Sequence, residues 1–290
     1  MRTVAEHRQY LEQLAAQVEN PAAGFFGPDS VAWRINREMV LGLVVLRALL
    51  MQVAHPKVAQ GVADHSDFTK RPFARAYATF NAQQHIVFGS CAESIEALMR
   101  IYIRHVGIRG ELHGSASDNT PTRYEANDPS LLFWVYTTLI DSMFYGYRTF
   151  LPDLEPPESA RFYEEGKLFA RLIGIPTEMV PPRLADFDAW MHAAIEGNEI
   201  QVSEAGRDIS RALLRVPIGF AAPVTRFLAA ATLPPRLRAQ FGLPWSPQRQ
   251  QIFDLLARWL RFISRHTPQA LHTSPTYWLA MRRVRAAQTA

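Results

Sequence analysis

Residues 128–147, DPSLLFWVYTTLIDSMFYGY, decide the fold class of this chain. Asp128 is placed to cap a helix with its side-chain oxygen, and Pro129 follows at the first helical position, where its missing N–H costs nothing. From Leu131 to Ile140 the predicted helix is apolar on almost every side, so we expect it to lie in the middle of the molecule. Asp141, inside the same helix, therefore needs a partner.

The helical period dominates on both sides of this stretch, and turn signals come roughly every 12 to 25 residues, farther apart than in strand-rich chains. We predict an all-α fold. Besides the central helix and a short one between His55 and His65, helices are expected from Asp29 or Ser30 to Ala54 and over 71–88, 91–104, 159–173, 182–199, 203–214, 248–266 and 275–287. Proline pairs at 156–157, 181–182 and 234–235 mark joints. With no repeat and no low-complexity linker, residues 1–290 are expected to form a single compact globular domain.

The composition is that of a soluble globular protein, with 48% hydrophobic and 20% charged residues. The most apolar stretch, 39–54, is shorter than the roughly 20 residues of a membrane-spanning helix, so we interpret it as a buried core helix. The only cysteine is Cys91, which excludes a disulfide framework and a cysteine-built metal site. The first residues carry charges and no apolar core of a signal peptide, so we expect a cytoplasmic protein.

Charge is distributed unevenly along the chain. Residues 226–290, the predicted basic C-terminal helices, carry a net charge of +9, and the first 225 residues carry −5. Trp245, Trp259, Tyr277 and Trp278 lie among these C-terminal arginines. One interpretation is a solvated helical face that pairs with acids elsewhere in the fold. The other is peripheral contact with a membrane surface. No nucleic-acid-binding motif is present, and we expect no nucleic acid partner.

Several catalytic motifs are absent from the sequence: the Gly-rich phosphate loop, G-x-S-x-G, H-E-x-x-H and paired E-x-x-H helices. Histidines instead concentrate at His55, His65, His85, His105 and His113. In a helical core, a single imidazole facing an apolar pocket suffices to bind haem. The alternative for each histidine is a hydrogen-bonded core residue or a cation at a helix C-terminus, and the latter suits His105.

Five segments, taken together and in order, resemble one family of haem-dependent oxygenases. They are QVAHPKVAQGVADHSDF at 52–68, RPFARAYAT at 71–79, Phe88-Gly89, HVGIRG at 105–110 and YEANDPSLLFWVYTTLIDS at 124–142. The family comprises the latex clearing proteins (rubber oxygenases) and the fungal oxygenase that shortens a farnesyl side chain in mycophenolic acid biosynthesis. The resemblance covers roughly residues 30–200 and is weaker beyond them.

The resemblance implies an all-α fold with a haem pocket in its helical core, where haem b iron and dioxygen cleave an isoprenoid double bond. His105 matches the family's axial iron ligand. Arg75 and Thr79, four residues apart on one helical face, match an arginine and a threonine that border the haem. Arg75 would pair with a propionate or orient bound oxygen, and Thr79 would donate a hydrogen bond to it. Alternatively, Arg75 packs against a buried acid and Thr79 bonds a backbone carbonyl.

The sequence also departs from the family pattern. Ala78 stands where rubber oxygenases carry a lysine that can occupy the distal iron site, so that site is expected to be open or water-filled. Tyr136 stands where many relatives have histidine, and no residue matches the glutamate proposed as the base in rubber cleavage. His55 and His65 bracket a short helix and are interpreted as scaffolding, with a substrate entrance as the alternative. The aromatic residues of 129–147 form either plain core or a substrate tunnel.

From these residues and the resemblance, the leading hypothesis is a haem b oxygenase. It would use dioxygen to oxidise or cleave a double bond in a hydrophobic, isoprenoid or lipid-like substrate. A peroxidase-like or monooxygenase activity at the same haem is a second enzyme hypothesis. The alternative from a different class is a non-catalytic haem-binding protein, or a haem-free helical protein that docks on membranes.

Overall fold

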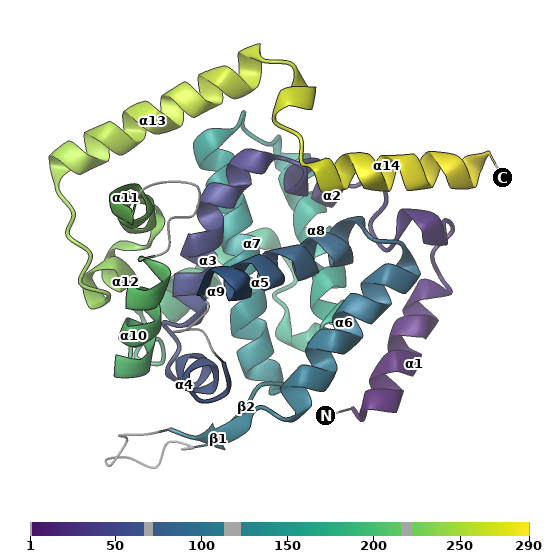
Figure 1. The fold of residues 1–290 in the computed structure, drawn as a ribbon, viewed down its shortest axis with the longest axis horizontal. Helices are drawn as coiled ribbons and strands as arrows, with labels where there is room; N and C mark the ends of the chain where they lie inside the picture. The colour runs from purple at the N-terminus through teal and green to yellow at the C-terminus, as the bar shows by residue number, and fades with distance from the viewer. Residues whose placement is uncertain (1, 67–71, 113–122, 216–221, 290) are drawn as a thin grey trace.

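The computed structural model describes residues 2–66, 72–112, 123–215 and 222–289, and the side chains of residues 72–76 lie outside this description. The fold is all-α, as predicted, with one two-stranded antiparallel sheet in the described part (Figure 1). The α-helices are α1 (Val4–Ala15), α2 (Val31–Asn36), α3 (Val45–Gln52), α4 (Pro56–His65), α5 (Pro72–Phe88), α6 (Cys91–Val106), α7 (Pro129–Phe150), α8 (Pro156–Leu172), α9 (Leu184–Glu196), α10 (Glu204–Leu213), α11 (Ala222–Thr232), α12 (Pro235–Gln240), α13 (Pro247–His266) and α14 (Pro275–Gln288).

Shorter elements connect these helices. The 3-10 helices are η1 (Pro21–Ala23), η2 (Met39–Val44), η4 (Thr177–Met179) and η5 (Gln269–Leu271). Strands β1 (Arg109–Glu111) and β2 (Arg123–Glu125) pair antiparallel, with Arg109 opposite Glu125. The hairpin and the helices α1, α11 and α12 lie outside the ranges predicted from the sequence.

Helix α7 lies at the centre of the molecule, as its sequence predicted (Figure 1). The side chain of Asp128 accepts a hydrogen bond from the N–H of Ser130 (2.8 Å), and Pro129 occupies the first turn. The helix contacts η2, α3, α8 and α13, so it is covered on several sides. Its aromatic and aliphatic side chains, Phe133, Tyr136 and Phe144 among them, form the largest apolar core of the fold.

Asp141 finds its partner on α3. The guanidinium of Arg47 lies 2.5 Å from the Asp141 carboxylate, between Nη1 and Oδ2. Arg47 also donates to the carbonyl of Thr232 and to the Ser142 hydroxyl, both at 2.8 Å. This buried cation therefore ties α3 to α7 and α11, and its charge is balanced inside the protein.

The predicted continuous helix from Asp29 or Ser30 to Ala54 is wrong. Helix α2 ends at Asn36, and η2 and α3 follow as separate elements. The break arises because residues 37–39 pair with a distant segment: the N–H of Met39 donates to the carbonyl of His272 (2.9 Å), and the N–H of Ser274 donates to that of Arg37 (2.7 Å). Backbone groups used in this way cannot continue a helical hydrogen-bond ladder.

Segment 39–54 is largely buried, in agreement with its interpretation as core. In the ranges that the structure describes, no single helix combines the length and hydropathy needed to cross a membrane. Met39–Gln52 and Pro56–His65 meet that criterion only as a pair, and the chain bends by 99° between them.

Candidate active site

Helices α5 and α6 form a hairpin that carries the residues predicted to surround the cofactor. Its closed end is fixed by Gly89, where a Cβ atom would lie 2.2 Å from the carbonyl oxygen of His85. Ser90 then caps α6: its hydroxyl accepts from the N–H of Glu93 (3.2 Å), and the Glu93 carboxylate accepts from the N–H of Ser90 (2.7 Å). From this corner the two helices diverge (Figure 1).

His105 lies in the last turn of α6, at the open end of the hairpin, and is half-buried. Ser94 marks the face of α6 that contacts α5, because its hydroxyl donates to the carbonyls of His85 (3.1 Å) and Ile86 (3.2 Å) on α5. Ser94 and His105 are 11 residues apart, about three helical turns, so they share one face of α6. The His105 imidazole is therefore on the side of α6 that faces α5.

Thr79 lies on α5 and lines a cavity of about 20 Å³. Its side chain is exposed, whereas Gln83, one turn later and lining the same cavity, is half-buried. The other lining residues are Val44, Val45, Ala48, Leu49, Gln52, Phe80, Leu139, Ser142 and Met143. The structure thus brings Thr79 to an apolar internal space between α3, α5 and α7.

Of the other predicted residues, Arg75 begins the same helical face one turn before Thr79, but its side chain lies outside the described residues. His113 lies outside them altogether. His85 is exposed, and its Nδ1 donates to the carbonyl of Asn81 one turn back (2.8 Å). It therefore belongs to the outer surface of α5 and is no part of the site.

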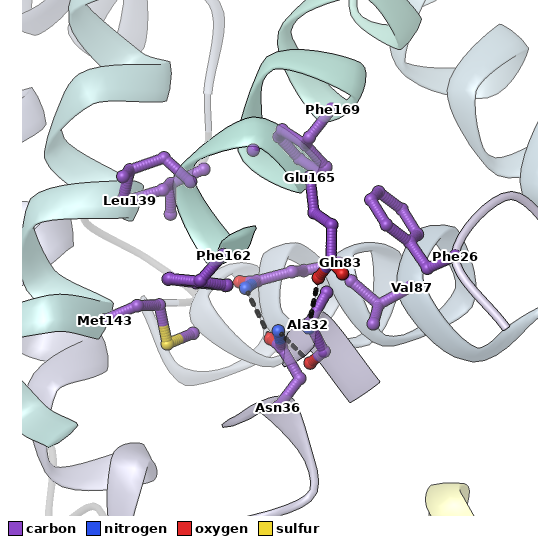
Figure 2. A pocket seen from close by; sticks show the side chains of 12 residues that line it. Phe26, Ala32, Asn36, Gln83, Val87, Leu139, Met143, Phe162, Glu165 and Phe169 are labelled. Carbon is purple, nitrogen blue, oxygen red and sulfur yellow. Dashed lines mark hydrogen bonds between the residues drawn. The ribbon is translucent and has the colours of Figure 1, made fainter. Parts of the chain in front are cut away.

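A second cavity of about 40 Å³ adjoins the first and was not predicted from the sequence (Figure 2). Both cavities are lined by Gln83 of α5 and by Leu139 and Met143 of α7, so they adjoin each other between these two helices. Phe26, Phe162 and Phe169 contribute to the wall of the larger one. In the sequence, the one hint of these cavities is Gln83, a polar residue that faces apolar residues of α7.

The polar groups of the larger cavity are bonded to the protein. Gln83 Nε2 donates to Asn36 Oδ1 (3.2 Å), and Asn36 Nδ2 donates to the carbonyl of Ala32 (2.9 Å), as Figure 2 shows. The Glu165 carboxylate accepts from the N–H groups of Val31 (3.1 Å) and Ala32 (2.7 Å) at the start of α2. Because these groups already have partners, the wall presents mainly apolar surface to a guest.

Tyr136, at the position where the family resemblance leads one to expect histidine, is completely buried. Its hydroxyl has no hydrogen-bond partner among the described residues. Burial raises the pKa of the Tyr136 phenol, so the group stays neutral. The Tyr136 hydroxyl oxygen lies 3.4 Å from the position that a Cβ atom would take at Gly166, a residue that lines the larger cavity. A neutral hydroxyl therefore stands beside the wall of that cavity.

His55 and His65 have structural contacts at the two ends of α4. His55 Nδ1 accepts from the N–H of Lys57 (3.2 Å) and caps the helix, while its Nε2 lies 3.7 Å from the Glu199 carboxylate. Burial lowers the pKa of His55. His65 Nε2 donates to the carbonyl of Arg109 on β1 (3.2 Å). These contacts support the interpretation of both histidines as scaffolding.

One further cluster holds α4 against the hairpin that follows α6. The Tyr124 hydroxyl donates to Asp64 Oδ2 (2.6 Å), and Gln60 Nε2 donates to Asp64 Oδ1 (2.7 Å). Gly110 has no room for a side chain, because a Cβ there would lie 2.5 Å from the Tyr124 hydroxyl. Asp64 and Tyr124 lie within the segments that carry the family resemblance, which is the one signal that pointed to them.

The donor chemistry at the open end of the α5–α6 hairpin fits a haem. Within the described ranges no group of three His, Cys, Asp or Glu side chains is gathered as for a bare metal ion. Haem iron needs less from the protein, because the porphyrin supplies the in-plane ligands and one imidazole suffices as the axial ligand. His105 on α6 offers that imidazole toward α5, which carries Thr79.

Fold and site together define a helical domain in which Thr79 on α5 lines an apolar cavity and His105 lies in the last turn of α6. Residues 33–262 match the family described as "ER-bound oxygenase mpaB/B'/Rubber oxygenase, catalytic domain". The chain belongs to this family and is an oxygenase, which confirms the family predicted from the sequence. Among solved structures, "Structure of Latex Clearing Protein LCP in the closed state" is similar at 14% identity and a TM-score of 0.47, covering 97% of this chain and 73% of that one. No curated protein matches the chain.

Proposed function

We propose that this oxygenase depends on haem b and uses dioxygen to oxidise or cleave a double bond in a hydrophobic, isoprenoid or lipid-like substrate. The observation that carries the proposal is the position of His105, half-buried at the open end of α6 and on the face toward α5. The family match supports the oxygenase class. The apolar cavities support a hydrophobic substrate.

Three side chains would serve the cofactor. His105 would hold the iron, and Arg75 would pair with a propionate at the edge of the haem. Thr79, one turn along the same face of α5, would donate a hydrogen bond to an oxygen atom near the iron. When bound, the haem supplies the one-electron and dioxygen chemistry that protein side chains lack.

The interior would select and position the substrate. The lining of both cavities is mainly aliphatic and aromatic. In the larger cavity the amide and carboxylate groups of Asn36, Gln83 and Glu165 are already hydrogen-bonded, whereas Gln52, which lines the smaller one, has an Nε2 with no hydrogen-bond partner among the described residues. Apart from that one amide, a polar substrate would lose its hydration there without gaining partners, whereas an apolar chain would not. Leu139 and Met143, which both cavities share, would contact a chain that extends from one cavity to the other. The same apolar walls would keep water from the reacting double bond.

The first test is replacement of His105 by alanine. We expect the purified wild-type protein to carry about one haem b per chain, measured by its Soret band and a pyridine haemochrome assay. The H105A protein should lose the haem and keep its far-UV circular dichroism, because it loses a coordinate bond rather than core packing. The matched control is H85A, which removes an exposed histidine of α5 and should leave the spectrum unchanged. Haem retained in H105A with an unaltered iron spectrum would remove His105 from the site.

The second test separates the chemistry from binding. Thr79→Val should keep the haem but slow dioxygen-dependent turnover of an alkene or isoprenoid by about 100-fold, the usual cost of one lost donor. Thr289→Val, on the exposed end of the chain, is the control and should turn over normally. Turnover that requires peroxide or an external electron donor would instead indicate a peroxidase or monooxygenase. Haem bound without any turnover would indicate a carrier.

A further inference from the structure

Helix α13 exposes a row of large apolar side chains to solvent. Ile252, Leu255, Trp259 and Phe262 are 59%, 63%, 58% and 58% exposed. Their spacing of three, four and three residues places them along one side of the helix. We call this row the apolar stripe. In the described part of the chain no residue covers it.

The stripe is not simply the core face of a loosely packed helix. The opposite side of α13 carries Phe253, which is buried and lies against Phe150 of α7 and Phe227 of α11, with ring centroids 6.0 and 6.5 Å apart. The helix is thus already docked on the protein by its other side. Its outward apolar side chains remain available to something outside the chain.

Cations accompany the stripe along one edge. Arg258 and Arg265, seven residues apart, follow the same side of the helix next to Trp259 and Phe262. Both are exposed, and among the described residues neither lies within ion-pair distance of a carboxylate. The only acidic residue in α13, Asp254, accepts a hydrogen bond from Gln250 (2.8 Å). Arg258 Nε donates to the backbone carbonyl of Asp254 (3.4 Å). An apolar row edged by guanidinium groups that lack a carboxylate partner matches a surface that is apolar inside and anionic at its border.

The same surface character continues into the next elements. Leu271 in η5 is 69% exposed, and Trp278 and Leu279 in α14 are 43% and 63% exposed. Arg282, one turn after these two, is also exposed. Figure 1 shows α13 and α14 along one edge of the molecule. The apolar and cationic side chains therefore extend over more than one helix.

We propose that the apolar stripe docks this protein on a bilayer that contains anionic lipids. Side chains such as Trp259 and Phe262 suit the boundary between headgroups and acyl chains, and Arg258 and Arg265 would meet the lipid phosphates. A second copy of the chain fits the surface less well, because a two-fold contact in which the stripes run antiparallel brings like-charged arginine edges together. The proposal does not depend on the haem or on the reaction.

Vesicle flotation tests the proposal with the full-length protein. We expect the wild type to float with phosphatidylcholine vesicles that contain phosphatidylserine, and added salt should weaken this binding. Leu255→Ser/Trp259→Ser should weaken it by more than tenfold. Arg258→Gln/Arg265→Gln should weaken it about 30-fold on the anionic vesicles, from about 1 kcal/mol per arginine, and leave binding to pure phosphatidylcholine unchanged. Val224→Ser, an exposed apolar residue of α11, is the matched control and should bind like the wild type.

Three results would overturn the proposal. The first is a wild type that floats with neither kind of vesicle, and the second is a stripe variant that binds as well as the wild type while its thermal unfolding is unchanged. The third comes from sedimentation velocity: if the wild type is a dimer and Leu255→Ser/Trp259→Ser makes it a monomer, the stripe is covered by a second copy. Because haem content is unaffected in all three cases, failure here is distinguishable from failure of the H105A test.

Discussion

Helices α7 and α13 are nearly equal in length, with 22 and 20 residues, and both are rich in leucine, isoleucine and aromatic residues. Thirteen residues of α7 are buried, whereas in α13 only Phe253 is. The same residue types therefore form a core in one helix and an outward surface in the other. An apolar period in a sequence shows that a helix has something to bury, but the partner is set by the rest of the fold.

The charged residues of the two helices differ in the same way. Asp141 of α7 meets a buried cation, Arg47, 2.5 Å away. In α13, Arg258 and Arg265 are exposed, and Arg261, which donates to the backbone carbonyl of Arg148, approaches the Asp153 carboxylate only at 3.8 Å. Charges inside the protein must be matched there, and charges outside are matched by water or by a ligand.

The largest expected effect on the free energy of unfolding comes from removing one partner of the ion pair between Arg47 and Asp141. Arg47→Ala should lower the free energy of unfolding by about 3–5 kcal/mol, because it leaves the carboxylate of Asp141 without its cation and the carbonyl of Thr232 without its donor. Urea denaturation at neutral pH measures this loss.

The matched variant replaces both charges, as Arg47→Met/Asp141→Leu, and should cost much less than Arg47→Ala alone. If Arg47→Ala costs less than about 1 kcal/mol, the pair behaves like a surface ion pair and the contrast with α13 is lost.

A smaller effect, on the pH dependence of stability, is expected from His7 in α1. His7 is buried and stacks on Tyr102 of α6 with ring centroids 4.0 Å apart. Burial, with a contribution from the charge of Arg2, lowers the pKa of His7 to about 4. In the unfolded chain, the same imidazole takes up its proton near pH 6.5. The free energy of unfolding is therefore unaffected by His7 above about pH 6.5, and it falls as the pH is lowered from there toward 4.

The loss should reach about 3 kcal/mol at the lower pH, from 1.36 kcal/mol per unit of pKa. His7→Phe, measured by denaturation across this pH range, should abolish that part of the pH dependence. Parallel profiles for the variant and the wild type would show that His7 is protonated as easily in the folded protein as in the unfolded chain.

The smallest effect is expected on the apolar stripe. Trp259→Ser should change the free energy of unfolding by no more than about 0.5 kcal/mol, because its side chain is already mostly in water. Phe253→Ala, in the same helix but on its buried side, should cost about 3 kcal/mol. A large loss for Trp259→Ser would mean that the stripe supports the fold, and the difference between α7 and α13 would then be one of degree.

Local sequence signals predicted much of the fold. The cap at Asp128 and Pro129 gave the start of α7, and its all-round apolar character gave its central position. Arg75 and Thr79 were assigned to one helical face by spacing, and both positions lie on α5, where Thr79 lines a cavity. Such features depend on neighbours within one or two helical turns, which the sequence displays directly.

Features that depend on distant segments could not be predicted in this way. Hydrogen bonds to residues 272–274 cause the break between α2 and η2, and no residue near Arg37 in the sequence predicts these bonds. The sequence showed that Asp141 needs a partner, but not that Arg47 supplies it. The cavities exist because side chains of several helices fail to fill the space around Leu139 and Met143, which no local pattern encodes.

The pairing between residues 37–39 and 272–274 also constrains the order in which the protein is completed during synthesis. The buried Glu38 carboxylate accepts from His272 Nδ1 (2.8 Å), 234 residues later in the chain. Because the ribosome synthesises residues 38 and 39 before residue 272, the Glu38 carboxylate and the N–H of Met39 cannot form their hydrogen bonds to His272 until that residue has emerged. The corner between α2 and η2 is therefore among the later parts of the nascent protein to reach its final structure, although it is translated long before residues 272–274.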